Sequence, residues 1–283
     1  MRRTPVIRRF GHNRLHLQDG PIDLIAEAFG AAEEIEIAYR AAGARFITIL
    51  DELCAELPLL RSAGAARPVG IVAQRMWDAV APFASAQFIT PMAAVAGAVA
   101  EEVLGAMTNA GSLQRAYVNN GGDIAVFLAK GETLRIGMVD RPDYPSMFGS
   151  LFLASDQPVR GIATSGWRGR SFSLGIADAV TVLADTAAMA DAAATIIANA
   201  VDLPGHAAIE RRAAQDLAPD NDLGARPVTV AVGTLTEAEK AAALERGCRA
   251  AEMCLDRQLI RAVALHLGGQ TRQVEGALQI AAA

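Results

Sequence analysis

The spacing of apolar and polar residues changes along this chain of 283 residues. Two short runs, Thr4 to Phe10 and Arg14 to Leu17, flank Gly11-His12-Asn13, which predicts a β-hairpin. From Ala31 to Leu60 the apolar side chains recur at helical spacing, and acidic residues come early. A long amphipathic helix is therefore expected there, with Gly43 as the point at which it could be interrupted.

The middle of the chain changes from helical to strand spacing. A connector at residues 65–70 precedes a predicted helix at Ile71–Val80, and Pro91 opens another at about Met92–Ala110. Strands are then expected at Ala116–Val118, Asp123–Leu128, Thr133–Val139, Ser150–Leu153 and Val159–Thr164. Because Asn120-Gly121-Gly122 is a hairpin signal, these strands form an antiparallel meander.

Helical spacing returns in the last third of the chain. Helices are expected at Thr186–Val201, with Asp185 as N-cap, at Ala207–Leu217 and at Thr236–Leu265; a strand is expected at Val228–Val232 and a loosely held tail at Gly268–Ala283. Strands and helices cluster without regular βαβ alternation, which predicts an α+β fold in which an antiparallel meander packs with long helices. The length fits one unit over residues 1–283 or two closely packed lobes.

Composition narrows the class of protein. With 52% hydrophobic and 20% charged residues the chain is expected to fold as a globular protein, and its net charge of −5 disfavours nucleic-acid binding. Cys54, Cys248 and Cys254 make no disulfide framework, so a reduced, cytoplasmic protein is expected, with the last two in the core. The uncharged stretch Val80–Ala100 is rich in small residues and contains Pro91, and we interpret it as buried protein rather than a membrane span.

Three segments carry residues suited to nucleotide chemistry. Asn119-Asn120-Gly121-Gly122-Asp123 has two adjacent glycines through which backbone N–H groups can approach a phosphate, although a plain hairpin turn explains the same pattern. Thr164, Ser165 and Gly166 place two hydroxyls at the end of a predicted strand, where such hydroxyls often bond within their own loop. Either interpretation fits these two segments.

The third segment lies on the predicted helix after Asp185. Asp191 and Thr195 are four residues apart, so their oxygens share one helical face. A carboxylate and a hydroxyl beside phosphate oxygens are ligands that Mg²⁺ accepts. A solvated aspartate and a threonine bonded to the preceding turn are the alternative.

Together the three segments resemble the ApbE-like family of FAD:protein FMN transferases. Val118 to Ile124 is similar to the family's V-N-x-G-G-D-I, Ala163 to Gly166 to its S/A-T-S-G, and Ala190 to Thr195 to its A-D-A-x-A-T. The likeness covers about residues 90–201, whereas the segment Leu17–Leu24 and the long helix after it resemble an uncharacterised cytoplasmic branch of the same superfamily.

The resemblance implies a fold, ligands and partners. Asp191 and Thr195 would be magnesium ligands, the Thr90-Pro91 stretch would add a backbone carbonyl, and FAD would bind at Asn119–Asp123 and Thr164–Gly166. The implied activity is transfer of FMN from FAD to a Thr or Ser of an acceptor flavoprotein. We accordingly expect the three segments to converge on one pocket.

Two family segments are replaced in this chain. Thr90 to Gly97 stands in place of A-K-G-Y-A-x-D and lacks its lysine and aspartate, and Ser171 to Asp178 stands in place of H-I-I-D-P. Whether the protein is an enzyme is therefore open. Two alternatives to the transferase remain: an enzyme such as a hydrolase of a small ring compound or nucleotide, and a non-catalytic flavin-binding protein.

Overall fold

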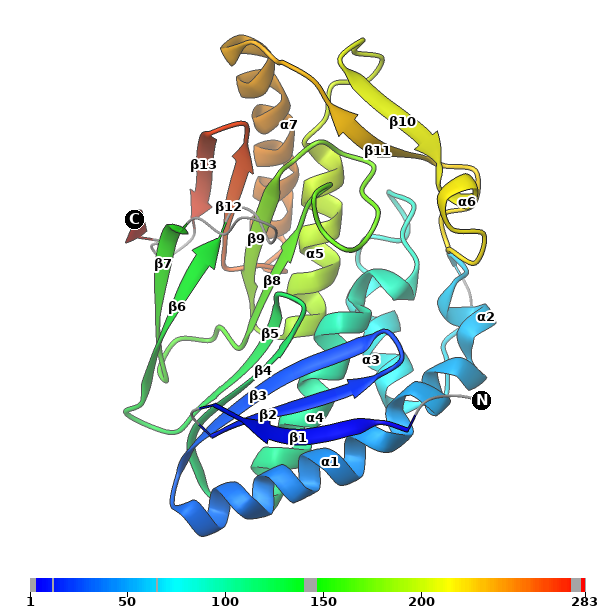
Figure 1. The fold of residues 1–283 in the computed structure, drawn as a ribbon. Coiled ribbons are helices and arrows are strands. Elements are labelled where there is room, and N and C mark those ends of the chain that lie inside the picture. Colours follow the sequence, from blue (N-terminus) through cyan, green and yellow to red (C-terminus); the bar gives the residue numbers. More distant parts are fainter. Residues whose placement is uncertain (1–3, 12, 65, 140–146, 276–280, 283) are drawn as a thin grey trace. The chain divides into compact units, whose positions relative to one another are not determined.

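A computed structural model describes residues 4–11, 13–64, 66–139, 147–275 and 281–282. Figure 1 draws their helices and strands. The described residues divide into two compact units. The first holds the described residues within 1–134, 153–163 and 185–191, and the second holds those within 135–152, 164–184 and 192–283. Strand β8 (Gly161–Ser165) and helix α5 (Ala187–Ala200) begin in the first unit and continue into the second.

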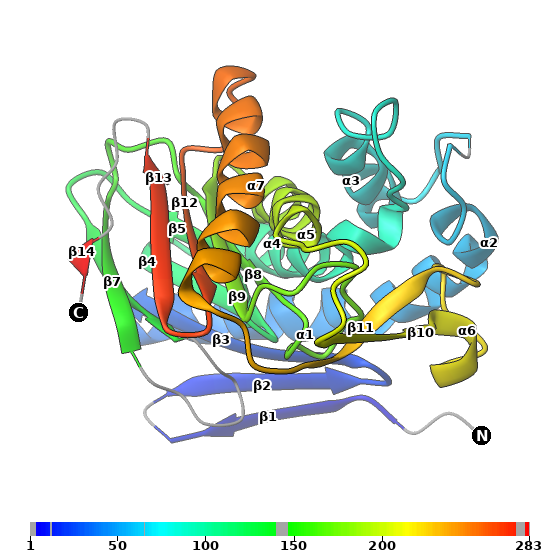
Figure 2. The same ribbon diagram turned by 90° about the horizontal axis from the view of Figure 1, so that it is seen from above.

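The first unit is built on antiparallel strands joined in chain order. Its strands are β1 (Val6–Phe10), β2 (Arg14–Asp19), β3 (Ile22–Gly30), β4 (Leu113–Asn120) and β5 (Asp123–Leu128), each paired antiparallel with the next. Figure 2 shows β1, β2 and β3 side by side. Ile124 and Ala125 of β5 pair in turn with the start of β8.

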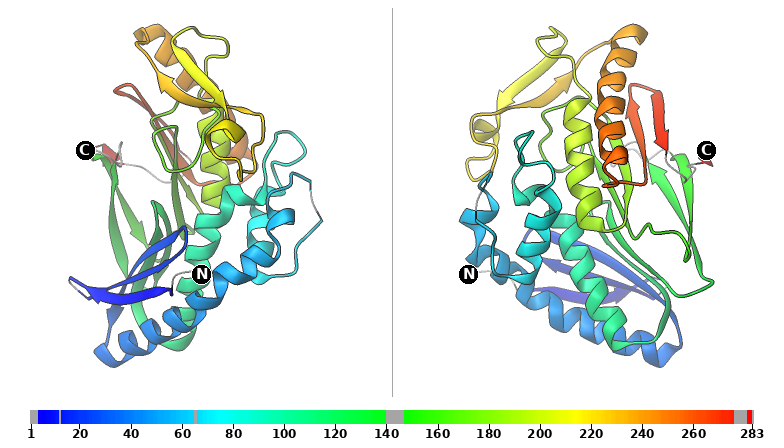
Figure 3. Two further views of the ribbon diagram at one scale, coloured as in Figure 1. Left: turned by 45° about the vertical axis from the view of Figure 1, so that its right-hand side comes forward. Right: turned by 180° about the vertical axis from the view of Figure 1, so that it is seen from behind.

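Helices of the first unit cover one face of this sheet. They are α1 (Ala32–Ala55), α2 (Leu57–Leu60), α3 (Ile71–Val80), a 3₁₀ turn at Pro91–Ala94 and α4 (Val95–Ala110). Helix α4 packs on α1 and on β4 and β5, as the right-hand view of Figure 3 shows. Alternate residues of β3, including Leu24, Ala26 and Ala28, are buried beneath the helices.

The second unit combines short sheets with one long helix. Its remaining elements are β6 (Thr133–Val139), β7 (Met147–Ala154), β9 (Ala179–Ala184), β10 (Ile209–Ala213), α6 (Ala214–Leu217), β11 (Pro227–Val232), α7 (Glu237–Asp256), β12 (Ala262–Leu267), β13 (Gln270–Glu275) and β14 (Ala281–Ala282). Strand β12 pairs antiparallel with both β9 and β13, and α7 packs on β12 and β13.

The predicted class, α+β with an antiparallel meander and long helices, is confirmed. The hairpin at β1 and β2 is also confirmed, although His12 of its predicted turn lies outside the described residues. Cys248 and Cys254 are buried as expected, and Cys54 is exposed. Among the described residues, no helix combines the length and apolar character that crossing a membrane requires.

Several predicted helical boundaries are wrong. Helix α1 continues through Gly43, whose missing side chain leaves room for Ile7 of β1, and it ends at Ala55 instead of Leu60. The helix predicted from Met92 begins as a 3₁₀ turn, and regular α-helix starts at Val95. The N-cap of α5 is Thr186, not Asp185, because the Thr186 hydroxyl accepts a hydrogen bond from Met189 N at 3.2 Å.

Long-range pairing overrides the other helical predictions. Of the predicted helix Ala207–Leu217, residues Ile209–Ala213 form strand β10, which pairs antiparallel with β11, and only Ala214–Leu217 are helical, as α6. The predicted helix Thr236–Leu265 ends at Asp256, and β12 follows as an almost continuously buried strand between two neighbours. A short, almost continuously apolar run shows neither strand nor helical periodicity, so its sequence does not distinguish a strand from a helix.

Besides β10 and β12, four strands of the described residues are absent from the predicted set: β3, β9, β13 and the two-residue β14. Strand β3 follows the first hairpin, β9 is buried at every position, and β13 occupies part of the segment predicted to be a loose tail. All six residues of β13 pair with β12, which holds this part of the chain in the sheet. The tail prediction is therefore wrong for Gln270–Glu275.

Helix α7 offers a test of local stabilisation, because its first turn is capped in both directions. The Thr236 hydroxyl accepts from Glu239 N, and the Glu239 carboxylate accepts from Thr236 N at 2.7 Å. We expect Thr236→Ala to lower the free energy of unfolding by about 1 kcal/mol in urea titrations. Thr234→Ala, at an exposed position two residues earlier, is the matched control and is expected to change it by less than about 0.5 kcal/mol. Equal losses in the two variants would contradict the cap.

Candidate functional site

A tight turn joins β4 to β5 at the first candidate segment. Asn120 pairs with Asp123, and Gly121 and Gly122 between them have φ angles of +67° and +116°. Positive φ at both central residues is the geometry of a two-residue hairpin turn, which glycine adopts without strain. The Asn119 side chain accepts a hydrogen bond from Gly122 N at 2.8 Å and fixes the turn.

Asn120 connects this turn to the start of α4. Asn120 is 8% exposed, and its Nδ2 donates to the carbonyl of Ala96 at 3.1 Å. The carbonyl belongs to the first turn of the helix, just after the 3₁₀ turn opened by Pro91. The hairpin turn and the beginning of α4 are therefore held together by a nearly buried amide.

The first turns of α4 and α5 meet with backbone in contact. A Cβ on Gly97 would lie 2.2 Å from the carbonyl oxygen of Ala187 and 2.7 Å from Ala188 N, distances that no side chain can occupy. Gly161 of β8 approaches the same helix in the same way, since its Cβ would lie 2.1 Å from the Thr186 carbonyl. Glycine at both positions lets the beginning of α5 sit close to α4 and β8.

Asp191 lies on α5 beside the start of α4. Its Oδ2 accepts a hydrogen bond from Gly97 N at 3.0 Å. Burial and the neighbouring Asp123 carboxylate raise the pKa of Asp191 well above its ordinary value, and the N–H groups of Gly97 and Ala96 oppose that rise. The Asp123 and Asp191 carboxyl groups therefore repel each other when both are charged.

A bound cation would stabilise this arrangement, because without one the two negative charges repel each other. Mg²⁺ is commonly held by one or two carboxylates together with water and phosphate oxygens, and it would relieve the repulsion between Asp123 and Asp191. Among the described residues no group of three or more His, Cys, Asp or Glu side chains could hold a metal by itself. The donor set thus fits a hard ion that completes its coordination with a phosphate ligand.

The other predicted site residues belong to the second unit. Thr195 follows Asp191 by one helical turn on α5, and both side chains are partly exposed while Ala192–Ala194 between them are buried. The Thr164 hydroxyl bonds with the Thr181 hydroxyl at 2.9 Å. A Cβ on Gly166 would lie 2.4 Å from the Asp178 carbonyl, which gives this glycine a packing role.

The first unit therefore brings together Asn119–Asp123 and Asp191, which are far apart in sequence. Thr164–Gly166 and Thr195 lie in the other unit, so convergence of all the segments on one pocket stays a prediction. The residue that sequence reasoning missed is Gly97. The sequence signal that could have identified it is a glycine among alanines a few residues after Pro91. Glycine weakens a helix, so its presence there indicates a close packing contact.

A surface depression of about 370 Å³ lies elsewhere in the first unit. Residues from β3, β4 and α1 line it, among them Glu27, Phe29 and Arg115. Arg115 and Asn120 stand near opposite ends of β4, about 16 Å apart at the usual rise of a strand. The depression is thus separate from the turn at Gly121-Gly122.

Comparison with known proteins gives one family and a set of partial relatives. The model of the family described as "AbpE bacteria" matches residues 7–273. A UPF0280 protein of Methanococcoides burtonii is 42% identical over 123 residues, covering 43% of this chain and 50% of the relative. A UPF0280 protein of Methanosphaerula palustris is 40% identical over 131 residues, covering 46% and 52%. The chain spans about half the length of the curated relatives it matches.

Solved structures of low sequence identity also align with the chain. The flavin transferase ApbE of Vibrio cholerae aligns with a TM-score of 0.40 and 11% identity, covering 96% of this chain and 98% of that one. The flavinyl transferase ApbE of Pseudomonas stutzeri, in its apo form, aligns with a TM-score of 0.39 and 12% identity, covering 96% and 95%.

The contact at Gly97 predicts a large effect of one methyl group. Gly97→Ala is expected to lower the free energy of unfolding by more than about 2 kcal/mol, because the new Cβ meets backbone that cannot rotate away. Gly105→Ala on the same helix is the matched control: nothing lies within 4 Å of its Cβ, and the exchange is expected to stabilise by about 0.5–1 kcal/mol. Denaturant unfolding measures both, and stabilisation by Gly97→Ala would contradict the contact.

The raised pKa of Asp191 predicts a pH dependence. A carboxyl whose pKa is higher in the folded than in the unfolded protein favours folding when protonated, so it lowers the free energy of unfolding as pH rises from about 4 through the folded pKa. Without divalent cations, Asp191→Asn should therefore stabilise the protein at pH 8 and have little effect at pH 4. Thermal unfolding across this range measures the difference.

Asp78→Asn is the control for that experiment, because Asp78 of α3 is an exposed carboxylate paired with Arg67. It should show no gain at pH 8. A destabilisation of the Asp191→Asn protein that is equal at both pH values would contradict the electrostatic account.

Proposed function

Because this chain belongs to the family described as "AbpE bacteria", we propose that it is a Mg²⁺-dependent flavin transferase that moves FMN from FAD to a Thr or Ser of a partner protein. The observation that carries the proposal is the position of the Asp191 carboxylate at Gly97 N, next to the helix turn that Asn120 ties to the Gly121-Gly122 turn, with Asp123 raising the pKa of Asp191. Like-charged groups in a buried setting are costly unless a counter-ion accompanies them.

Each residue of the proposed magnesium and phosphate site would have a distinct role. Asp191 would hold the metal ion through its carboxylate, with Thr195 one turn further along α5 as a second oxygen ligand. The Gly121-Gly122 turn has no Cβ that would keep a phosphate or ring edge away from its backbone N–H groups. Asn119 and Asn120 would keep that turn at a fixed distance from the start of α4 through the bonds they already make.

The proposed chemistry is a phosphoryl transfer. The acceptor hydroxyl loses its proton and forms a bond to the FMN phosphorus of FAD, the diphosphate bond breaks, and AMP leaves. Bound Mg²⁺ would neutralise charge on the diphosphate oxygens. The chain's own residues would contribute mainly by positioning the nucleotide and excluding alternative geometries.

A flavin-binding protein without transfer is the second candidate, and one observation favours it. Asp178 ends the segment that replaces the family's H-I-I-D-P, and its carboxylate is occupied by structural bonds. It accepts from Trp167 Nε1 at 3.3 Å, Arg168 Nε at 2.7 Å and Gly268 N at 2.7 Å. A carboxylate engaged in this way holds a loop in place and is poorly suited to exchange protons with a substrate.

Calorimetry with FAD and Mg²⁺, followed by an assay for AMP release in the presence of a candidate acceptor, tests the proposal. We expect FAD binding that requires Mg²⁺, and AMP release coupled to covalent labelling of the acceptor. Asp191→Asn should weaken Mg²⁺-dependent binding by at least about tenfold while the protein stays folded, because the charged ligand is removed without loss of volume. Asp78→Asn, at an exposed position, is the control and should bind as the unaltered protein does.

The remaining outcomes separate the candidates. Absence of heat with every flavin nucleotide tested would overturn both the transferase and the flavin-binding functions. Binding without AMP release would favour the second candidate, and AMP release without labelling of the acceptor would indicate a nucleotide hydrolase.

A further inference from the structure

Glu101 stands on the face of α4 that meets α5. It follows Gly97 by four residues, so the two positions share one side of the helix. Its Oε1 accepts a hydrogen bond from Ala188 N at 2.7 Å. Ala188 lies in the first turn of α5, where backbone N–H groups have no partner within their own helix. A carboxylate of α4 therefore caps the beginning of α5.

The same two helices are joined by a second carboxylate in the opposite direction. Asp191 of α5 accepts from Gly97 N at the beginning of α4, at 3.0 Å. Each helix thus supplies a carboxylate to the N-terminal turn of the other, where the helix dipole favours negative charge. The two bonds join the same helix beginnings that meet where Gly97 approaches the Ala187 carbonyl.

Glu101 is itself held by an arginine of α3. Its Oε2 pairs with Arg75 Nε at 3.0 Å, and Arg75 Nη1 pairs with Glu102 at 2.9 Å and donates to the Ala98 carbonyl at 3.3 Å. Both glutamates are largely buried, with side chains 19% and 14% exposed. Arg75 is therefore fixed against α4 at several points.

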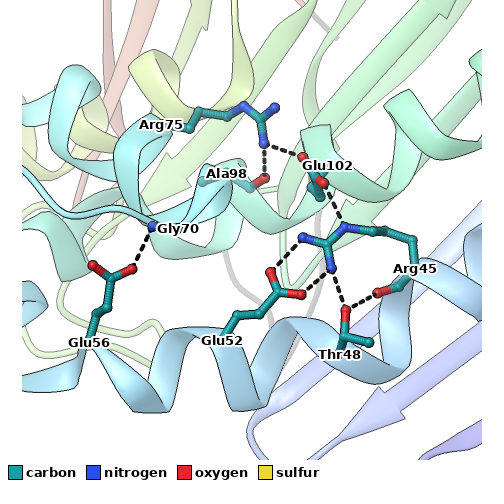
Figure 4. A network of polar contacts seen from close by, with 8 residues as sticks. All are labelled: Arg45, Thr48, Glu52, Glu56, Gly70, Arg75, Ala98 and Glu102. Carbon is teal, nitrogen blue, oxygen red and sulfur yellow. Dashed lines mark hydrogen bonds and ion pairs between the residues drawn. The ribbon is translucent and has the colours of Figure 1, made fainter.

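A second arginine extends this network to α1, as Figure 4 shows. Arg45 Nε pairs with Glu102 at 2.6 Å, and its two terminal nitrogens bond both oxygens of Glu52 at 2.7 Å. Alternating charges thus run from Glu52 through Arg45, Glu102 and Arg75 to Glu101. Such a chain restricts the rotamers of every member, and its last member touches α5.

We propose that Glu101 is a positioning residue for Asp191: it fixes the first turn of α5 against α4 and thereby holds the Asp191 carboxylate at Gly97 N. Ala188 and Asp191 are three positions apart, about 4.5 Å along the helix axis, so the cap and the carboxylate move together. The consequence for metal binding rests on the proposed function, in which Asp191 is the ligand. The role of Glu101 in holding Asp191 at Gly97 N does not depend on the proposed function.

Two measurements on the full chain test the two parts separately. Hydrogen exchange of the Gly97 amide in metal-free protein reports whether Asp191 stays in place, and calorimetry with Mg²⁺ alone or with FAD reports affinity. In Glu101→Ala we expect Gly97 exchange to be at least about tenfold faster and Mg²⁺-dependent affinity to be about tenfold or more lower. Glu101→Gln keeps an acceptor for Ala188 N, so it should recover most of both losses.

Asp78→Ala is the matched control, since it also removes a carboxylate from an arginine pair but at an exposed site on α3. It should change neither measurement. If Glu101→Ala does not fold, Arg75→Gln leaves the cap but removes its anchor, and it should speed Gly97 exchange in the same direction.

Unchanged Gly97 exchange in a folded Glu101→Ala or Arg75→Gln protein would overturn the positioning role, and so would equal losses in Glu101→Gln and Glu101→Ala. If the unaltered protein takes up no Mg²⁺ with or without FAD, the proposed function fails, while Gly97 exchange still decides the role of Glu101.

Discussion

The close approach of two helix beginnings is the constraint on which the candidate site depends. Helix α5 can start beside α4 only because Gly97 has no side chain, since any Cβ there would enter the backbone of Ala187. Backbone contact of this kind cannot be relieved by a rotamer change, unlike a contact between flexible side chains. The position of Asp191 next to Gly97 N and Asp123 is a direct result of this contact.

Electrostatics acts on the same contact in two opposing ways. Carboxylates from Glu101 and Asp191 are favourable at the opposite helix beginnings, where backbone N–H groups are otherwise unpaired. Burial nevertheless raises the pKa of Glu101, and burial with Asp123 raises that of Asp191. Glu101 has Arg75 as a counter-charge, whereas Asp191 and Asp123 repel each other, so a cation would be most stabilising beside these two carboxyl groups.

In this chain, residues of the two segments that replace those of the family have structural roles. Gly97 ends the segment that lacks the family's lysine and aspartate, and it is needed for helix contact. Asp178 ends the other segment and holds the turn after Thr164–Gly166 through bonds to Trp167, Arg168 and Gly268. Close packing therefore explains the glycine at position 97, and hydrogen bonding explains the aspartate at position 178.

The sequence by itself determined what local chemistry can specify. Two glycines after Asn120 predicted the turn between β4 and β5, and the spacing of Asp191 and Thr195 placed both on one helix. These signals act over a few residues, through φ angles and helical periodicity. Only the tertiary structure decided that β10 and β12 are strands, because their partners lie elsewhere in the chain. The meeting of Gly97, Glu101 and Asp191 likewise depends on how two helices pack, and contacts between residues 87 and 94 positions apart leave no local pattern in the sequence.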